Sequence, residues 1–504
     1  MSAYPISFWF VMAILLTGAV WSIQRVKDGA GIPMLAVLGT VAVWYVGDAF
    51  YNDYADTYAT IFDAGVLQNA WGEVALFLIV FLAAAPYIHK RFNARYLRGQ
   101  SGIVQLVRGG INHPMLQRQL DILFVGCVVI YAIIILVAAI RIKSQMFYFF
   151  FPYLGYKPEV WGRQRIGSGF DALLSFTEYV QMMVTAIFGV LAAVSTNRRT
   201  RFWSMALCFV SWPYYLFDRA RNVVLLIIIP AMLSWAFLRL RGGILKKLVA
   251  LGCLFILVNG WMAFIIQNRS NQNIAAAFMQ KGFNLQKESE VHHEGLNMFE
   301  ELCWINTFIE KGTYEPNWGQ RYFAELVNPV PRALWHGKPL IGIDYAIARG
   351  QGMRNSGNSN GNDAAGVYAT ISTGMIGQGV VNFGRLLGPA AAALLMSFWV
   401  AILARQDLQI WKLGRLPLYA LGLILTFNLG RDITFITLYP FAFGAVAFWW
   451  LDRHRSQHVS QPALNTTNQP GSRMRPAPSP ARRPSRRRRM IMRHNARFNG
   501  SRPS

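Results

Sequence analysis

The chain has 504 residues, of which 54% are hydrophobic and only 14% are charged, and its formal net charge is +25. This composition excludes an ordinary soluble domain, because apolar runs of about 20 residues, the length that crosses a bilayer as a helix, recur along it. Nearly half of this net charge follows Leu451 and most of the rest lies in short connections. The charge therefore indicates membrane topology rather than a nucleic-acid partner.

The apolar runs predict an all-α polytopic membrane protein with about eleven transmembrane helices and one large outer loop between helices 8 and 9. The expected spans are residues 6–22, 31–50, 72–88, 121–140, 172–194, 203–217, 223–238, 248–266, 379–404, 416–429 and 433–451. The chain then divides into eight helices within 1–266, the loop at 267–378, three helices within 379–451 and a basic tail at 452–504.

Lys and Arg gather in alternate connections between these spans, which by the positive-inside rule face the cytoplasm. An odd number of spans then places the N-terminus and the large loop outside and the C-terminus inside. One connection departs from the rule, since residues 141–165 hold Lys and Arg and fall outside. The tail is rich in Pro, Ser and Arg, so we expect it to be disordered in the cytoplasm and to contact anionic membrane lipids.

The large outer loop is too long to be a structureless connector in a compact protein. Apolar residues from Leu296 to Ile309 recur mostly at three- and four-residue spacing, which predicts an amphipathic helix lying on the membrane or on the bundle. Residues 320–327 predict a second, shorter helix that ends before Pro329. Because Pro329 and Pro331 stiffen the backbone, Arg332 is expected to be aimed by the segment that carries it.

Arginine is the most suggestive residue on the outer side. A guanidinium binds phosphate oxygens through a fork of two donors and keeps its charge at physiological pH, so a group of them suits a lipid diphosphate. The alternative for Arg219, Arg221 and Arg431 is that Asp218 and Asp432 pair with them and merely pin two short turns. The outer arginines are Arg219, Arg221, Arg332, Arg349, Arg354, Arg385 and Arg431.

Two stretches carry a resemblance to a known family. NPVPRALWHGKP (328–339), followed by ISTGMIGQGVVNFGRLLGP (371–389), resembles the bacterial O-antigen or oligosaccharide repeat-unit polymerases over approximately residues 120–451. The resemblance implies a membrane-embedded glycosyltransferase that needs no metal or cofactor. Such an enzyme moves the growing glycan from undecaprenyl diphosphate to the next carrier-linked repeat unit. Many relatives have Glu where this chain has Gln378, so Gln378 is not taken as a base.

The resemblance also implies a location and partners. The protein is expected in the bacterial inner membrane, with its N-terminus and large loop in the periplasm. Its expected partners are the undecaprenyl-diphosphate-linked oligosaccharide, membrane lipids, a chain-length regulator and a flippase, with no nucleic acid.

The transfer of a glycan from undecaprenyl diphosphate needs groups that stabilise the leaving diphosphate. The primary candidates are Arg219, Arg221, Arg332, Lys338 and Arg431, and the secondary ones are Arg349, Arg354 and Arg385.

The reaction also needs a base for the acceptor hydroxyl, and the sequence leaves its identity open. Lys338, named above as a diphosphate ligand, has an alternative role, in which its amine reaches toward lipid head groups. Adjacent histidines are not at metal-ligand spacing, and no nucleotide-binding motif is present. The candidate bases are His292, His293, Glu294, Glu300 and Asp344.

Three other functions fit part of the pattern. An O-antigen ligase would use the same donor and an equally large outer loop. A polyprenyl-monophosphate-sugar glycosyltransferase would use a carboxylate in the first outer loop, where Asp53 and Asp56 lie. A transporter of polysaccharide or lipid-linked glycan is an alternative of another class, but broken spans in paired halves, which are typical of transporters, are not evident.

Overall fold

A computed structural model describes most of the chain up to residue 459. The described residues are 4–51, 54–97, 100–154, 157–158, 160–161, 171–217, 221–267, 297–328, 330, 334–335, 337–339, 342–350 and 371–459. Residues Met1–Arg453 form one compact unit, and His454–Ser504 form a second. The second unit includes the end of the last helix, and the predicted disordered tail lies otherwise outside the described residues.

The described residues are helical and contain no strand, as predicted for an all-α protein. The longer helices are α1 (Ile6–Gln24), α2 (Gly31–Val41), α5 (Ala64–Phe92), α7 (Pro114–Ile142), α9 (Asp171–Val194), α10 (Arg198–Leu216), α11 (Arg221–Ser234), α12 (Ile244–Gln267), α14 (Met298–Glu310), α17 (Gly374–Leu408), α18 (Arg415–Leu429) and α19 (Phe435–Val459). The shorter ones are α3 (Asp48–Tyr51), α4 (Ala59–Ile61), α6 (Gly102–Gly109), α8 (Met146–Phe150), α15 (Gln320–Val327) and α16 (Ile343–Ala348).

Each of the eleven predicted spans falls on a helix, but the helices differ in length and polarity. Among the described residues, seven helical segments are long and apolar enough to cross a membrane. They are Ile6–Gln24, Gly31–Phe50, Ala64–Phe92, Pro114–Phe150, Phe176–Val194, Leu245–Ile265 and Gly374–Leu408. The apolar segments Val223–Arg239 and Arg415–Leu429 are shorter. The structure thus shows an all-helical protein of membrane character, and eleven spans remain a prediction.

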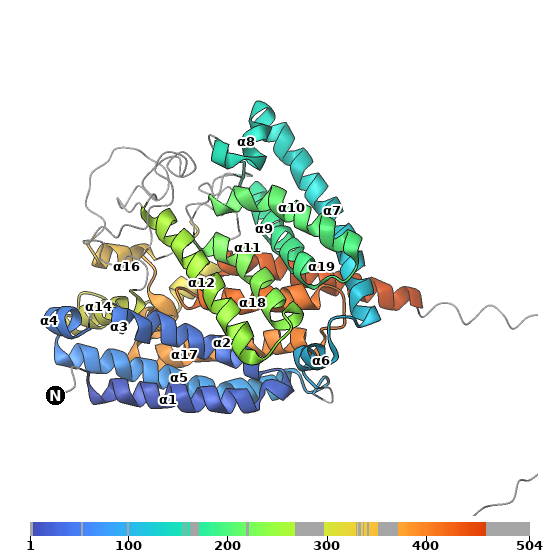
Figure 1. The fold of residues 1–504 in the computed structure, drawn as a ribbon. Coiled ribbons are helices and arrows are strands. Elements are labelled where there is room, and N and C mark those ends of the chain that lie inside the picture. Colours follow the sequence, from blue (N-terminus) through green and yellow to red (C-terminus); the bar gives the residue numbers. More distant parts are fainter. Residues whose placement is uncertain are drawn as a thin grey trace, which may run out of the picture. The chain divides into compact units, whose positions relative to one another are not determined.

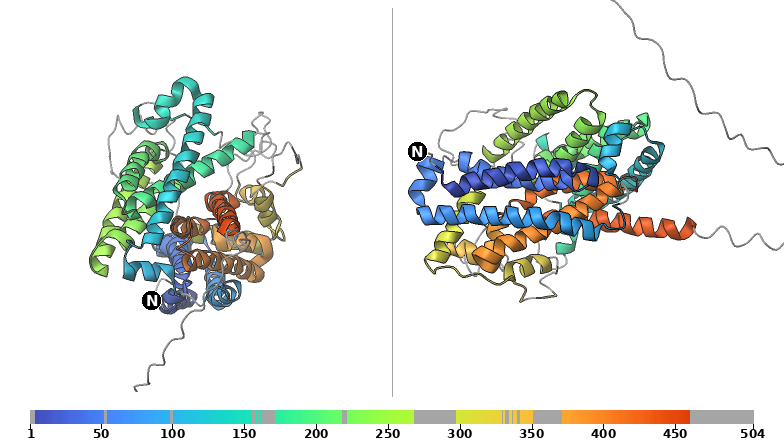
Figure 2. Two further views of the ribbon diagram at one scale, coloured as in Figure 1. Left: turned by 90° about the vertical axis from the view of Figure 1, so that its right-hand side faces the viewer. Right: turned by 90° about the horizontal axis from the view of Figure 1, so that it is seen from below.

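The helices of the first unit pack in two groups. In one group α5 packs along α17, and α1 and α2 pack beside them. In the other group α9 packs against α7, α10 and α11. Helix α18 contacts α11 and α9 on one side and α17 and α2 on the other, so it joins the two groups. Figure 2 shows the blue and orange helices of the first group beside the green and teal helices of the second.

Connections that are far apart in the chain meet at the two ends of this bundle. At one end the amide of Ser101 donates to Lys27 O (2.9 Å), and the amide of Ile103 donates to Asp407 Oδ1 (2.8 Å). At the opposite end α3, α4, α14 and α16 gather, while α6 lies at the first end (Figure 1). These two sets are the connections that the charge pattern assigns to opposite sides of the membrane.

The amphipathic helix predicted in the large outer loop is confirmed as α14. Its apolar face is buried against the bundle, with Phe299 stacked on Trp71 of α5 at 4.0 Å between ring centroids. The buried carboxylate of Asp48 accepts hydrogen bonds from the amides of Phe299 (2.7 Å) and Glu300 (3.1 Å), which lack partners within the helix because they are in its first turn. The second predicted helix is confirmed as α15, Gln320–Val327.

Candidate active site

Helix α17 is broken at Gly384, where φ is 76° and ψ is −178°. Only glycine adopts this conformation readily, because it has no Cβ. The turn brings Gly379 so close to Gly388 that a Cβ on either residue would collide with backbone atoms of the other. The Asn-Phe-Gly-x-x-x-Gly stretch therefore contains a tight turn between two helical segments. The predicted span from residue 379 is interrupted there, and its straight part follows Gly384.

This turn holds α15. The carbonyl of Val381 accepts from the amide of Asn317 (3.0 Å), and the carbonyl of Asn382 accepts from the amide of Gly319 (3.2 Å). The side chain of Asn382 accepts from the amide of Tyr322 in the first turn of α15 (3.2 Å) and donates to Gln378 O (2.7 Å). The carbonyls that the break in α17 leaves without partners in the helix thus bind the segment at the start of α15.

Arg321, on the first turn of α15, is almost completely buried, with 3% of its surface exposed. One terminal nitrogen donates to Asp432 Oδ1 and to Ile371 O, both at 3.4 Å. Its other terminal nitrogen and its Nε have no hydrogen-bond partner. Asp432 Oδ1 also accepts from the amide and the hydroxyl of Thr373, each at 3.3 Å. Arg321 is therefore held by one edge and leaves two buried donors unused.

Glu325 lies one helical turn after Arg321 and is 4% exposed. One carboxylate oxygen has no hydrogen-bond partner, while Thr434 hydrogen-bonds the side chain. Burial raises the pKa of Glu325 from its ordinary value of 4.5 to about 7, and the charge of Asp432 acts in the same direction. The charge of Arg321 and the hydrogen bond from Thr434 oppose this shift. The carboxyl group therefore titrates near neutral pH.

The alternative interpretation of the sequence was that Arg431 pairs with its neighbour Asp432. The structure shows no such pair. The Nε of Arg431 donates to Ser372 Oγ at 2.8 Å, whereas Asp432 pairs with Arg321. Residues 371–373 thus contact both arginines. Among the described residues, the side chain of Arg431 makes no other hydrogen bond, so its terminal nitrogens have donors to spare.

Gln378, where many members of the resembled family have Glu, is fully buried and has a structural role. Its Oε1 accepts from the amide of Ile433 (2.7 Å), and its Nε2 donates to Ile433 O (3.2 Å). A carboxylate could accept the first bond but could not donate the second. Together with the bond from the Met375 amide to Gly430 O (3.0 Å), this pairing ties the start of α17 to the turn that carries Arg431 and Asp432.

The predicted bases in the described residues are bound within the fold. Glu300 accepts a hydrogen bond from the indole of Trp304 (3.1 Å). Asp344 accepts from the hydroxyl of Tyr314 (2.6 Å) and from the amide side chain of Asn317 (3.2 Å). Neither residue forms a hydrogen bond or an ion pair with Arg321 or Arg431. His292, His293 and Glu294 lie outside the described residues.

Some of the predicted cationic residues are likewise bound within the fold, and others lie outside the described residues. Lys338 is buried and donates to the carbonyls of Asn328 (2.9 Å) and Val330 (3.0 Å). Arg349 pairs with the buried Glu301 (3.1 Å) and lies over the ring of Trp304. Arg385 pairs with Glu310 (2.7 Å) and donates to Asn306 O (3.1 Å). Arg219, Arg332, Arg354 and the side chain of Arg221 lie outside the description, as do Asp53 and the side chain of Asp56.

The structure adds two candidate site residues that were not among the sequence candidates, Arg321 and Glu325. Their spacing of four residues on a predicted helix was visible in the sequence, but such pairs usually lie on solvated faces. Their burial follows from the docking of α15 on Asn382, which helix periodicity does not reveal. In the described part of the chain, no group of three His, Cys, Asp or Glu side chains could hold a metal ion.

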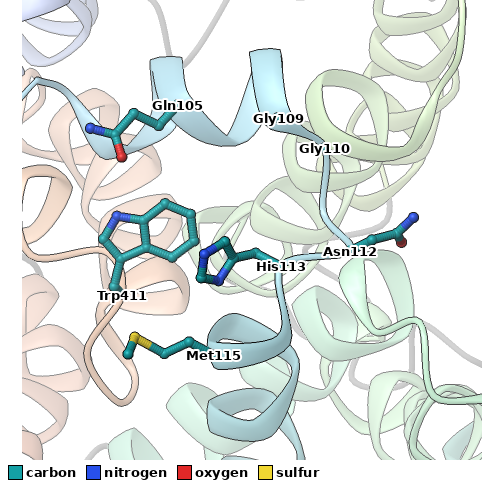
Figure 3. Close-up of a pocket in the computed structure, with 7 residues that line it drawn as sticks. All are labelled: Gln105, Gly109, Gly110, Asn112, His113, Met115 and Trp411. Carbon is teal, nitrogen blue, oxygen red and sulfur yellow. The ribbon is translucent and has the colours of Figure 1, made fainter. Parts of the chain in front are cut away.

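A cavity of about 570 Å³ opens at the other end of the bundle (Figure 3). Its lining residues are Gln105, Gly109, Gly110, Asn112, His113, Met115 and Trp411. The ring of His113 lies 4.5 Å from the ring of Trp411, between centroids. Among the described residues, no arginine or carboxylate contributes to the lining, so this cavity does not resemble a site for phosphate chemistry.

No protein-family model, curated protein or solved structure matches the chain.

Proposed function

We propose that the protein is a glycosyltransferase that polymerises lipid-linked oligosaccharide repeat units at the outer face of the bacterial inner membrane. The growing glycan would leave undecaprenyl diphosphate and join the next carrier-linked unit. The observation that carries the proposal is the buried guanidinium of Arg321, which has two donor nitrogens without partners. The half-buried Arg431 bonds to Ser372, next to Ile371, which Arg321 bonds. Buried polar groups without partners are costly, and a bound anion would satisfy them.

A polyprenyl diphosphate suits these donors in charge and geometry. As the glycosidic bond breaks, negative charge grows on the leaving diphosphate, and fixed donors in a water-poor site stabilise that charge. Arg321 is preorganised for this role because Asp432 and Ile371 hold one edge of its guanidinium. Arg431 is tied through its Nε to Ser372, which leaves its terminal nitrogens for the same anion.

The resemblance to repeat-unit polymerases gives the proposal its second support. The glycines and the asparagine of the quoted stretch act together in the structure. They form the turn that positions α15, and they are Gly379, Asn382, Gly384 and Gly388. Arg332, in the other quoted stretch, follows α15 by five residues in the chain and stays a predicted diphosphate ligand. Sequence features that the resemblance singles out therefore support the helix that carries Arg321.

Deletion of the gene in its host, followed by glycan profiling, tests this proposal. A polymerase mutant should carry glycans of a single repeat unit, and the wild-type gene should restore long chains. A ligase mutant would instead accumulate long polymer on the carrier lipid, and loss of a transporter would leave single units facing the cytoplasm. Either of these results, or an unchanged glycan profile, would contradict polymerase function.

A further inference from the structure

We propose that Glu325 is the general base that removes the proton from the acceptor hydroxyl. This inference rests on the proposed function and assigns a residue for which the sequence offered other candidates. Glu325 is placed by geometry beside the donors assigned to the leaving group, because it follows Arg321 by one turn on the same face of α15.

The first support is the free carboxylate oxygen of Glu325. It is nine-tenths buried and has no hydrogen-bond partner, and the two unused donors of Arg321 lie one turn away. A fold that merely needed an ion pair would be expected to join these two groups, yet no hydrogen bond or ion pair joins them. A substrate that carries both an anionic group and a hydroxyl would satisfy both sets of atoms.

The second support comes from comparison with other buried carboxylates near this end of the bundle. Asp48 is occupied by two amides of α14 and by the hydroxyl of Tyr58. Glu301 accepts hydrogen bonds from Tyr345, Arg349 and Asn297. Their oxygens are therefore used by the fold. Glu73 has one buried oxygen without a hydrogen bond, but that oxygen lies 4.0 Å from Arg385 Nε, whereas among the described residues the free oxygen of Glu325 has neither a hydrogen bond nor an ion pair.

The surroundings of Glu325 favour proton uptake near neutral pH. The charged and titratable groups that act with it are Arg321 on its own helix, Asp432 in the turn before α19, and Tyr439 on α19. Burial and Asp432 raise the pKa of Glu325 to about 7, against the opposing effects of Arg321 and Thr434. A base in this range is deprotonated in a large share of molecules at neutral pH and still accepts a proton effectively.

The proposed step balances as a single displacement. The free carboxylate oxygen of Glu325 takes the proton of the acceptor hydroxyl as that oxygen forms a bond to the anomeric carbon. The bond from this carbon to the diphosphate oxygen breaks, and its electron pair leaves with the diphosphate, held by Arg321 and Arg431. The proton on Glu325 is then released to water, so no oxidant, reductant or further reactant is required.

The test compares Glu325→Gln, Glu325→Asp and Glu315→Gln in reconstituted membranes supplied with the lipid-linked repeat unit. Glu315 is exposed and precedes the same helix, so it is the matched control. We expect Glu325→Gln to lower turnover by roughly 10²- to 10⁴-fold, which is the usual contribution of a positioned base. Binding of undecaprenyl diphosphate should change little, and Glu325→Asp should retain part of the activity.

The pH profile separates a base from a residue that only stabilises the fold. Wild-type turnover should rise about tenfold per pH unit below pH 7 and level off above it, whereas the residual rate of Glu325→Gln should not depend on pH through this group. A flat wild-type profile, or near-normal turnover in Glu325→Gln, would overturn the assignment. If Glu325→Gln does not fold, the wild-type profile alone decides. If the wild type forms no glycosidic bond at all, the proposed function itself fails.

Discussion

The backbone of Gly379 lies directly against the backbone of Gly388, nine residues later, because the chain turns at Gly384 between them. A methyl group on Gly388 would collide with the backbone of Gly379. We therefore predict that Gly388→Ala separates the two helical segments and displaces α15. Overpacking of this kind costs about 1–3 kcal/mol or more. The thermal midpoint of the purified protein should fall and polymer synthesis should be lost.

Gly126→Ala, in α7, is the matched control for this substitution. A Cβ on Gly126 would have no neighbouring atom within 4 Å. This variant should keep the wild-type thermal midpoint, since alanine also favours the helix over glycine. A Gly388→Ala protein as stable and active as the control would show that the close approach of the two glycines is dispensable.

Arg321→Lys tests whether the site requires a forked donor rather than a positive charge alone. Lysine keeps the charge but cannot hold Asp432 and Ile371 while presenting further donors to a diphosphate. We expect turnover to fall roughly 10²- to 10³-fold, as for the loss of one donor to a developing oxyanion. Polymer formation by membranes with matched protein levels is the measurement.

Arg405→Lys is the control for the arginine substitution. Arg405 lies near the rings of Phe92 and Tyr96 at the opposite end of the bundle. Its replacement should leave polymer formation close to that of the wild type. Equal activity in Arg321→Lys and Arg405→Lys would remove Arg321 from the site.

Much of the fold could be predicted from the sequence, because it follows local patterns. The periodicity of residues 296–309 predicted α14, and the stretch before Pro329 predicted α15 with its correct limits. The turn inside α17 could not be predicted in this way, since an apolar helix pattern continues through it. The glycines at 379, 384 and 388 were a signal, but their mutual contact appears only in three dimensions.

The candidate site was less predictable, because it depends on which charged residues become buried. The sequence singled out outer arginines as a class, and Arg431 bonds to Ser372 in the segment that also contacts Arg321. Arg349 and Arg385, by contrast, pair with glutamates on α14. Nothing in the spacing of the sequence separates such ion pairs from free donors. Arg321 and Glu325 emerged only when α15 was seen docked on the turn at Asn382.

Gln378→Glu tests the structural role of Gln378. The carboxylate would lose the donor that bonds Ile433 O and would place two acceptors together in a fully buried position. We predict destabilisation of about 1–3 kcal/mol, seen as a lower thermal midpoint at pH 8, where glutamate is most easily ionised. Higher activity of the Glu variant at unchanged stability would instead favour a catalytic group at this position.

The pH dependence of stability tests the burial of Glu325. Its pKa is about 7 in the folded protein and near 4.5 when exposed, so the folded state binds the proton more tightly. The stability this provides is fully present below about pH 4.5 and is lost as pH rises to 7. Glu325→Gln should therefore gain on the order of 3 kcal/mol relative to wild type between pH 4.5 and pH 8. Parallel thermal midpoints of the two proteins across this range would contradict a buried, titrating Glu325.

The most direct test of the central claim uses the lipid-linked repeat units that a strain lacking the gene accumulates. Purified wild-type protein in vesicles should convert them into a ladder of longer glycans and release one undecaprenyl diphosphate for each new glycosidic bond. Arg321→Lys protein of equal stability should produce neither in comparable amounts. Folded wild-type protein that yields no ladder and no released diphosphate would contradict the account.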